Sequence, residues 1–186
     1  MDTSAHVAFL SLGSNLGDRP ELLRSAIQTL TGKPLIELDL STGVASLYET
    51  SPVGARLPQP RFLNTAVRLR TGRPPHDLLH LILEVESAFG RLRGERGEPR
   101  VIDIDLLLFD DVAIEGDELT VPHPRLAERR FALEPLAEIA PNVIHPLLGL
   151  TIGELARQAR VEHDDDEVIR VAGPEWVLTQ TPLESA

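Results

Sequence analysis

Two aspartates, Asp103 and Asp105, interrupt the otherwise apolar stretch formed by residues 101–109. Successive side chains of a β-strand alternate between its faces, so both carboxylates should point the same way. Two carboxylates on a buried strand face repel each other and are costly to desolvate unless a cation lies between them. The oxygen-preferring cation that suits such a pair is Mg²⁺, which usually binds together with phosphate groups. A solvated strand face is the alternative that this spacing leaves open.

Four arginines lie within the ten residues that precede the aspartates: Arg91, Arg93, Arg96 and Arg100. The planar guanidinium matches the geometry of a phosphate group. A solvated loop, partly neutralised by neighbouring glutamates, is the plainer interpretation of the arginines alone. Together with the two aspartates, they predict a polyphosphate site.

Composition restricts the class of protein. The chain has 186 residues, of which 42% are hydrophobic, the size of one ordinary domain with a core. Its net charge of -11 argues against a nucleic-acid binder, whose binding surface would be basic. There is no cysteine, which excludes disulfides and cysteine-based zinc or redox sites. The sequence shows neither a signal peptide nor a long apolar run, so we expect a cytoplasmic protein without a membrane span.

The hydrophobic periodicity predicts the elements that position these residues. Strands are expected over residues 7–12, 36–48, 62–69, the Asp103 segment and 168–171, and helices after Asp18 and over 75–89, 126–139 and 151–160. The order β-α-β-β-α-β with appended elements indicates an α+β fold, a ferredoxin-like sandwich with an antiparallel sheet. We expect helices on one face of the sheet, with the other face free for ligands. Residues 1–160 are predicted to form the domain, and 161–186 an acidic extension packed on it or trailing from it.

Other motifs have plainer interpretations. The glycine-rich stretch 13–17 lacks the residues of known phosphate loops and is read as a turn between a strand and a helix. His76 and His80 have metal-ligand spacing but no third ligand, so we read them as surface histidines. His123, flanked by prolines, is either a positioned ligand or a helix cap. The acidic run 164–166 is read as a solvated tail.

Taken together, these segments resemble one family, the 6-hydroxymethyl-7,8-dihydropterin pyrophosphokinases of folate biosynthesis. The similarity covers roughly four-fifths of the chain, and its motifs occur in the family's order. They are Gly13-Ser-Asn-Leu-Gly17, Tyr48-Glu-Thr-Ser-Pro-Val-Gly54, Phe62-Leu-Asn-Thr-Ala66, residues 86–91, Pro99-Arg-Val-Ile-Asp-Ile-Asp105, Thr120-Val-Pro-His-Pro-Arg125, residues 129–136 and Ile144-His-Pro146.

The resemblance implies a reaction and a set of roles. Diphosphate passes from ATP to the pterin hydroxymethyl group, and AMP is released. Asp103 and Asp105 match the ligands of two Mg²⁺ ions, and the implied catalytic residues are Arg91, Arg100 and Asp105. The implied pterin contacts are Thr50, Pro52, Val53, Gly54, Phe62, Asn64 and Phe131, with the two phenylalanines sandwiching the ring. The implied ATP contacts are Glu86, Arg91, Arg93, Arg100, Leu106, Thr120, His123 and Arg129. We expect a monomer acting on two small molecules, without nucleic-acid or membrane partners.

The chain departs from the family pattern in the arginine-rich loop, which is expected to close over ATP as a lid. Many relatives have Arg-Trp-Gly-Pro-Arg where this chain has Arg96-Gly97-Glu98-Pro99-Arg100. The tryptophan contact of the lid therefore has no counterpart here. Two other functions stay open at this point. One is a Mg²⁺-dependent phosphohydrolase, and the other is a ligand-sensing module in which the aspartates are structural.

Overall fold

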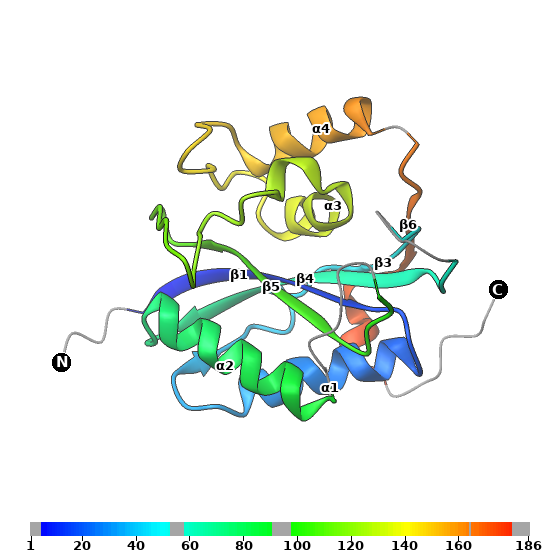
Figure 1. The fold of residues 1–186 in the computed structure, drawn as a ribbon, viewed down its shortest axis with the longest axis horizontal. Coiled ribbons are helices and arrows are strands. Elements are labelled where there is room, and N and C mark those ends of the chain that lie inside the picture. Colours follow the sequence, from blue (N-terminus) through cyan, green and yellow to red (C-terminus); the bar gives the residue numbers. More distant parts are fainter. Residues whose placement is uncertain (1–4, 53–57, 91–97, 164, 180–186) are drawn as a thin grey trace.

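A six-stranded antiparallel sheet forms the centre of the molecule (Figure 1). The computed structural model describes residues 5–52, 58–90, 98–163 and 165–179. The strands are β1 (His6–Ser14), β2 (Ile36–Glu37), β3 (Leu47–Thr50), β4 (Phe62–Thr71), β5 (Asp103–Phe109) and β6 (Val168–Ala172). Their order is β5-β1-β4-β3-β6, and β2 pairs with β4. The predicted α+β class with an antiparallel sheet is confirmed.

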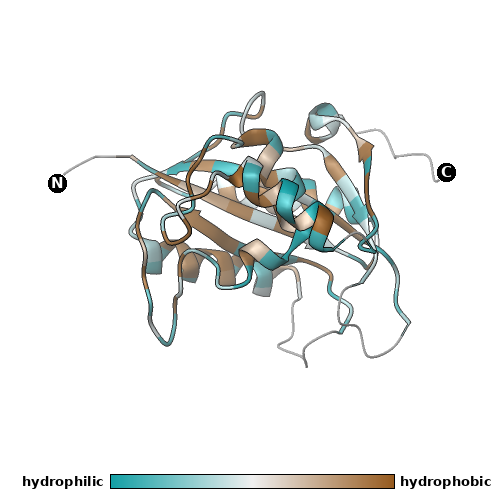
Figure 2. Ribbon diagram, turned by 90° about the horizontal axis from the view of Figure 1, so that it is seen from above, coloured by the Kyte–Doolittle hydropathy of each residue, from teal (hydrophilic) through white to brown (hydrophobic). Residues whose placement is uncertain are grey.

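Helices cover both faces of the sheet, so the expectation of helices on one face is wrong. The helices α1 (Arg19–Thr31) and α2 (Pro75–Ala88) lie on one side, and α3 (Arg130–Ile139) and α4 (Ile152–Glu162) on the other (Figure 1). The reason is that the strands are apolar on both faces. On β1, Leu10 and Leu12 face the core under α1 and α2, whereas Phe9 belongs to a second core with α3 and α4. Figure 2 shows the strands mostly hydrophobic and the helices of mixed hydropathy.

The predicted strand over residues 36–48 is also wrong, because it is interrupted. Only its two ends belong to strands, and between them Val44 forms an isolated bridge to Val67. Between β2 and β3, the Asp39 side chain accepts hydrogen bonds from the Ser41 amide at 2.9 Å, the Ser41 hydroxyl at 2.6 Å and the Thr42 hydroxyl at 2.7 Å. The Ser41 and Thr42 hydroxyls lower the pKa of Asp39 to about 2. Such local bonds offer the backbone an alternative to the sheet ladder. The helix predicted from 126 is likewise divided into a 3-10 turn, Leu126–Glu128, and α3.

The C-terminal segment completes the sheet and then crosses to the face covered by α1 and α2. β6 pairs with β3, which confirms the strand predicted over 168–171. Beyond it, Trp176 of the 3-10 turn Pro174–Val177 is buried in that core, and its indole N–H donates to the Ala45 carbonyl at 2.9 Å. Among the described residues, no helix is long and apolar enough to span a membrane.

Candidate active site

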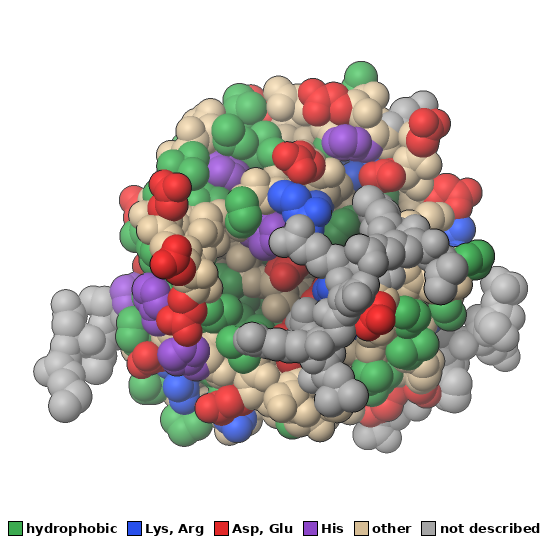
Figure 3. All heavy atoms as spheres, viewed as in Figure 1, with side chains coloured by type: hydrophobic (Ala, Val, Ile, Leu, Met, Phe, Trp, Pro, Cys, Tyr) green, Lys and Arg blue, Asp and Glu red, His purple; other side chains and the backbone are tan. Residues whose placement is uncertain are grey.

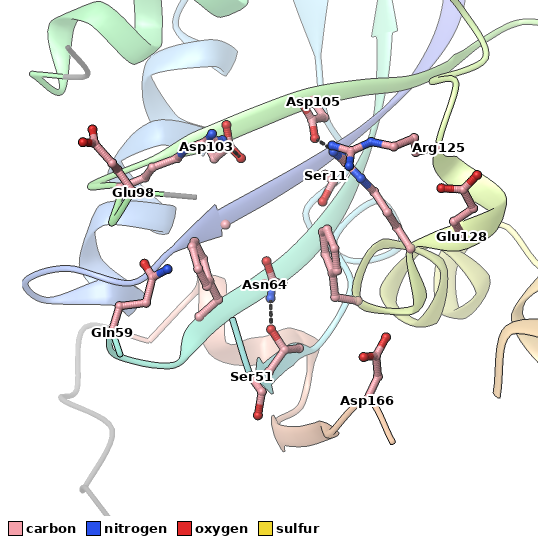
Figure 4. A pocket seen from close by; sticks show the side chains of 16 residues that line it. Ser11, Ser51, Gln59, Asn64, Glu98, Asp103, Asp105, Arg125, Glu128 and Asp166 are labelled. Atoms are coloured by element: carbon pink, nitrogen blue, oxygen red, sulfur yellow. Dashed lines mark hydrogen bonds and ion pairs between the residues drawn. The ribbon is translucent and has the colours of Figure 1, made fainter. Parts of the chain in front are cut away.

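The helices α3 and α4 cover only part of their face of the sheet. Under the helices this face presents Phe9, Ala66 and Leu107. Toward the other end of the same strands it presents small or polar residues, among them Ser11 and Asn64. Because these side chains cannot support packing of a further apolar layer, a cavity of about 360 Å³ remains (Figure 4). Its described lining is Ser11, Gly13, Thr50, Ser51, Gln59, Phe62, Asn64, Glu98, Arg100, Asp103, Asp105, Arg125, Glu128, Arg129, Phe131 and Asp166.

The carboxylate end of this cavity contains Asp103 and Asp105. Both side chains line the cavity, so the prediction that they share one strand face is confirmed. Each carboxylate already has an arginine partner. Arg100 Nη1 lies 2.6 Å from Asp103 Oδ2, and Arg129 Nη1 lies 2.6 Å from Asp105 Oδ2. Two acids and two guanidiniums are therefore paired at this end of the cavity.

His123 lies at the edge of this end and is not a helix cap, because the N-cap of the next 3-10 turn is Arg125, without a side-chain capping bond. Nδ1 of His123 accepts the amide hydrogen of Arg125 at 3.1 Å, so the neutral ring carries its proton on Nε2. That Nε2 lies 3.9 Å from Asp105 Oδ2. Burial lowers the pKa of His123, and the Asp105 charge opposes this only in part. The ring is therefore a neutral N–H donor that faces the carboxylate end.

The aromatic end of the cavity contains Phe62, from the start of β4, and Phe131, from the first turn of α3. Asn64 is 3% exposed, and its Nδ2 donates to Thr50 Oγ1 at 2.8 Å. A Cβ added to Gly13 would lie 2.6 Å from Asn64 Oδ1, so only glycine leaves room for this amide. The two aromatic rings and a fixed amide form a site for a flat heterocycle with polar edges.

In the turn after β1, Asn15 forms hydrogen bonds to two segments that border the cavity, at Gln59 and at Arg100. Asn15 is 1% exposed. Its Oδ1 accepts the Arg100 amide hydrogen at 2.7 Å, and its Nδ2 donates to Gln59 Oε1 at 2.8 Å. The expected turn between a strand and a helix is thus present after Ser14, the last residue of β1, and Asn15 in this turn positions the approach to β5.

Several residues implied by the resemblance do not line the described cavity. Glu86 is buried between α2 and β5, where its Oε1 accepts the Ile104 amide hydrogen at 2.7 Å. Leu106 belongs to the core under α1 and α2, on the opposite face of β5 from Asp105. Thr120 donates to the Gly116 carbonyl at 3.3 Å, and Pro52 adjoins the lining residue Ser51. The predicted contacts Val53, Gly54, Arg91 and Arg93, and the lid that contains Arg96, lie outside the described residues.

Sequence reasoning missed part of the cavity wall. Ser11 and Gly13 show the same two-residue spacing on β1 as the aspartates on β5, and Ser11 pairs with Asp105 in the sheet register. Arg125 lies two residues after His123, beside the same loop. Asp166 also lines the cavity, so the reading of its acidic run as a solvated tail is wrong for this residue. No sequence pattern marks Asp166, because only the pairing of β6 with β3 brings it there.

Figure 3 shows acidic side chains spread over one face of the molecule, with basic side chains beside a hollow and also elsewhere on that face. Among the described residues, no group of three or more His, Cys, Asp or Glu side chains could hold a metal ion by itself. A cation here would need ligands beyond the two aspartates, such as phosphate oxygens and water.

Comparison with known proteins decides the family. The family model for 7,8-dihydro-6-hydroxymethylpterin-pyrophosphokinase (HPPK) matches residues 9–141. The chain belongs to the HPPK family. The family expected from the sequence, and with it pyrophosphoryl transfer to hydroxymethyldihydropterin in folate synthesis, is confirmed.

Relatives and solved structures agree with the HPPK assignment. The 2-amino-4-hydroxy-6-hydroxymethyldihydropteridine pyrophosphokinase of Bacillus subtilis is 45% identical over 138 residues, 74% of this chain and 80% of the relative. The enzyme of that name from Methylorubrum extorquens is 40% identical over 164 residues, 88% of this chain and 98% of the relative. The crystal structure of Plasmodium falciparum HPPK-DHPS with pteroate has a TM-score of 0.67 at 17% identity, covering 88% of this chain. The chain spans 45% of that longer protein, so this similarity concerns the fold of the HPPK part.

Proposed function

We propose that the cavity binds ATP at its carboxylate end and 6-hydroxymethyl-7,8-dihydropterin at its aromatic end, and that diphosphate passes between them. The observation that carries this proposal is the union of both ends in one cavity of about 360 Å³. Paired acids and arginines at one end suit a polyphosphate, and two phenylalanines with a buried amide at the other suit a flat heterocycle.

The pterin ring would lie between Phe62 and Phe131, with its polar edge toward Asn64. Asn64 Nδ2 donates a hydrogen bond to Thr50. The amide oxygen Oδ1, which lies next to Gly13, is therefore the Asn64 atom that can accept a hydrogen bond from the ring. An amide held in one orientation reads the donors and acceptors of a ring edge without reorganising. Pro52, Val53 and Gly54 are proposed as further ring contacts on the resemblance alone.

Asp103 and Asp105 fit Mg²⁺, because both are oxygen ligands that face one cavity from one strand. We propose two ions, each held by these carboxylates and completed by phosphate oxygens and water. When bound, Mg²⁺ would neutralise the polyphosphate charge and orient the β-phosphate for attack.

The residues of the chain then bind, orient and balance charge. Arg100 and Arg129, relieved of the carboxylates, would bind the phosphates of ATP and the AMP that leaves. The hydroxymethyl oxygen forms a bond to the β-phosphorus as the bond from that phosphorus to the bridging oxygen of AMP breaks. Asp105 is the proposed acceptor of the hydroxyl proton, and the neutral His123 ring would donate its Nε2 hydrogen to a phosphate oxygen. Arg91 and Arg93, with Glu86, Leu106 and Thr120, are proposed ATP contacts, and Arg91 is also a proposed catalytic residue.

The test is to mix the protein with MgATP and 6-hydroxymethyl-7,8-dihydropterin and to measure AMP. We expect AMP and pterin diphosphate in equal amounts. Phosphate release from ATP without pterin would support the phosphohydrolase instead, and binding of pterin without turnover would support the sensing module. A folded protein that forms no AMP contradicts the proposal. A cytoplasmic, monomeric enzyme stays a prediction from the sequence.

A further inference from the structure

A carboxylate from the C-terminal segment faces the aromatic end of the cavity. Asp166 is half-buried and lines the cavity together with Thr50, Ser51 and Phe131. In Figure 4 it lies at the same end as Ser51, away from Asp105. Within the described parts of the chain, the hydrogen bonds of Asp166 are made by its backbone N–H and C=O, and its side chain has no hydrogen bond or ion pair. The carboxylate is thus available to accept a hydrogen bond from a ligand.

The backbone at Asp166 is fixed from the side of α3. Arg130 Nη1 donates to the Asp166 carbonyl at 2.8 Å and to the His163 carbonyl at 3.2 Å. Arg130 directly precedes Phe131, so the same turn of helix places an aromatic wall and holds the acidic segment. The position of the Asp166 carboxylate relative to the Phe131 ring is therefore set by the hydrogen bonds of Arg130, the residue next to Phe131.

The next residue, Glu167, fixes the segment from the side of the sheet. Its carboxylate accepts from Arg61 Nη1 at 2.5 Å and from the Ser51 hydroxyl at 3.2 Å. Arg61 precedes Phe62, and Ser51 follows Thr50. The acidic segment is thus attached through the neighbours of three proposed ring contacts, one on α3 and two on the sheet.

The substrate named for the relatives carries a 2-amino group on its ring, which has two N–H donors. Asn64 supplies one acceptor, Oδ1, because its Nδ2 already donates to Thr50. A second N–H that is enclosed without a partner would cost binding free energy. A carboxylate is acceptor-only and forms stronger bonds to such a donor than a neutral group does.

We propose that Asp166 is a specificity-determining residue for the pterin, and that its carboxylate accepts a hydrogen bond from the 2-amino group of the ring. The inference rests on the proposed function and extends it to a part of the chain that lies beyond residues 9–141, the match to the family model. It gives the acidic C-terminal segment a role at the aromatic end of the cavity.

The experiment compares two substrates with the wild-type protein, Asp166→Ala and Asp166→Asn. One substrate is 6-hydroxymethyl-7,8-dihydropterin, and the other is the same ring with hydrogen in place of the 2-amino group. For the amino ring we expect Asp166→Ala to raise KM about tenfold, and Asp166→Asn, which keeps an acceptor oxygen, about threefold. For the ring without the amino group, KM should change by less than about twofold, and KM for ATP should stay constant with both.

Asp165→Asn is the matched control, because it removes the same charge from an exposed neighbour that does not line the cavity. It should leave KM for both rings unchanged. If Asp166→Ala does not fold, Asp166→Asn decides the question. An active wild type in which the Asp166 variants raise KM equally for both rings, or for neither, overturns the role of Asp166 alone. Absence of AMP from the wild-type protein overturns the proposed function, which is a different result.

Discussion

The two ends of the cavity are organised in opposite ways. At the aromatic end, neutral groups hold one another in place: Asn64 bonds to Thr50 and is pressed against Gly13, beside Phe62. At the carboxylate end, the order depends on ion pairs of Asp103 and Asp105 with arginines. The first arrangement can remain unchanged when a ligand binds. The second has to change partners, because the same carboxylates are proposed to hold Mg²⁺.

The difference follows from the proposed ligands. A flat, rigid, uncharged ring is bound best by a site that is already in its bound geometry, since little order is then lost on binding. A polyphosphate with its cations brings several charges of both signs, and a site without them must neutralise its own acids. On the proposed function, the arginines would serve this purpose before binding and would then be available for phosphates. The following predictions separate the two ends, from the largest expected effect to the smallest.

Asp105→Ala should abolish chemistry and spare pterin binding. We expect the rate of AMP formation to fall on the order of 10³-fold, because the variant loses a proposed metal ligand that is also the proposed proton acceptor. The affinity for hydroxymethyldihydropterin, measured by calorimetry, should change by less than about twofold. Asp111→Ala, an exposed acid just after β5, is the control and should be fully active. A parallel loss of pterin affinity in Asp105→Ala would contradict the separation of the two ends.

Gly13→Ala should damage the aromatic end. The added Cβ would displace the Asn64 amide, from which it would be 2.6 Å away, and it would also approach Phe62. We expect KM for the pterin to rise on the order of 10-fold to 100-fold, with KM for ATP changed by less than about threefold. Gly72→Ala is the matched control, because its Cβ would meet only Leu35, at an ordinary distance of 3.5 Å. Equal losses for both substrates would show that the ends are not independent.

Arg129→Gln should make the carboxylate end bind cations better in the absence of nucleotide. Its guanidinium is the partner of Asp105, so its removal frees a carboxylate for a cation. We expect the affinity for Mn²⁺, measured by electron paramagnetic resonance without ATP, to rise about fivefold, and the affinity for ATP to fall about tenfold. Arg157→Gln, an exposed arginine on α4, makes the same change in net charge and should alter neither affinity. Unchanged Mn²⁺ affinity in Arg129→Gln would contradict the exchange of partners.

Acid should weaken the fold through the carboxylate end. Burial lowers the pKa of His123, so the unfolded chain takes up a proton at a higher pH than the folded protein does. This contribution to stability is complete above the ordinary histidine value of about 6.5 and is lost as the pH falls below it. Between pH 7.5 and 5.5, we expect Tm to fall about 2 °C more for the wild type than for His123→Asn. Burial also lowers the pKa of His145, but this residue is present in both proteins, so its contribution cancels in the comparison. Equal falls would show that the pKa of His123 is the same in the folded and the unfolded chain, and would contradict the lowering by burial.

The sequence predicted most elements, and the failures have physical causes. Long periodic segments such as residues 75–89 were predicted well, because one helix face carries the whole signal. The strand predicted over 36–48 failed because the side chain of Asp39 bonds to the following residues, a local effect that alternation does not reveal. The helices over 126–139 and 151–160 were predicted, but their place on the second face of the sheet was not, because apolar residues on alternate faces of β1 were not assigned to separate cores.

The sequence by itself determined the family, the fold class and the shared orientation of Asp103 and Asp105, because each is encoded in residue types at short, fixed spacings. The tertiary structure decided which distant side chains meet. It placed Gly13 against Asn64 through the pairing of β1 with β4, and it gave each aspartate an arginine partner. It also brought Asp166 from the C-terminal segment to the aromatic end. Strand register and side-chain packing between residues far apart in the chain depend on the whole fold, and no local pattern specifies them.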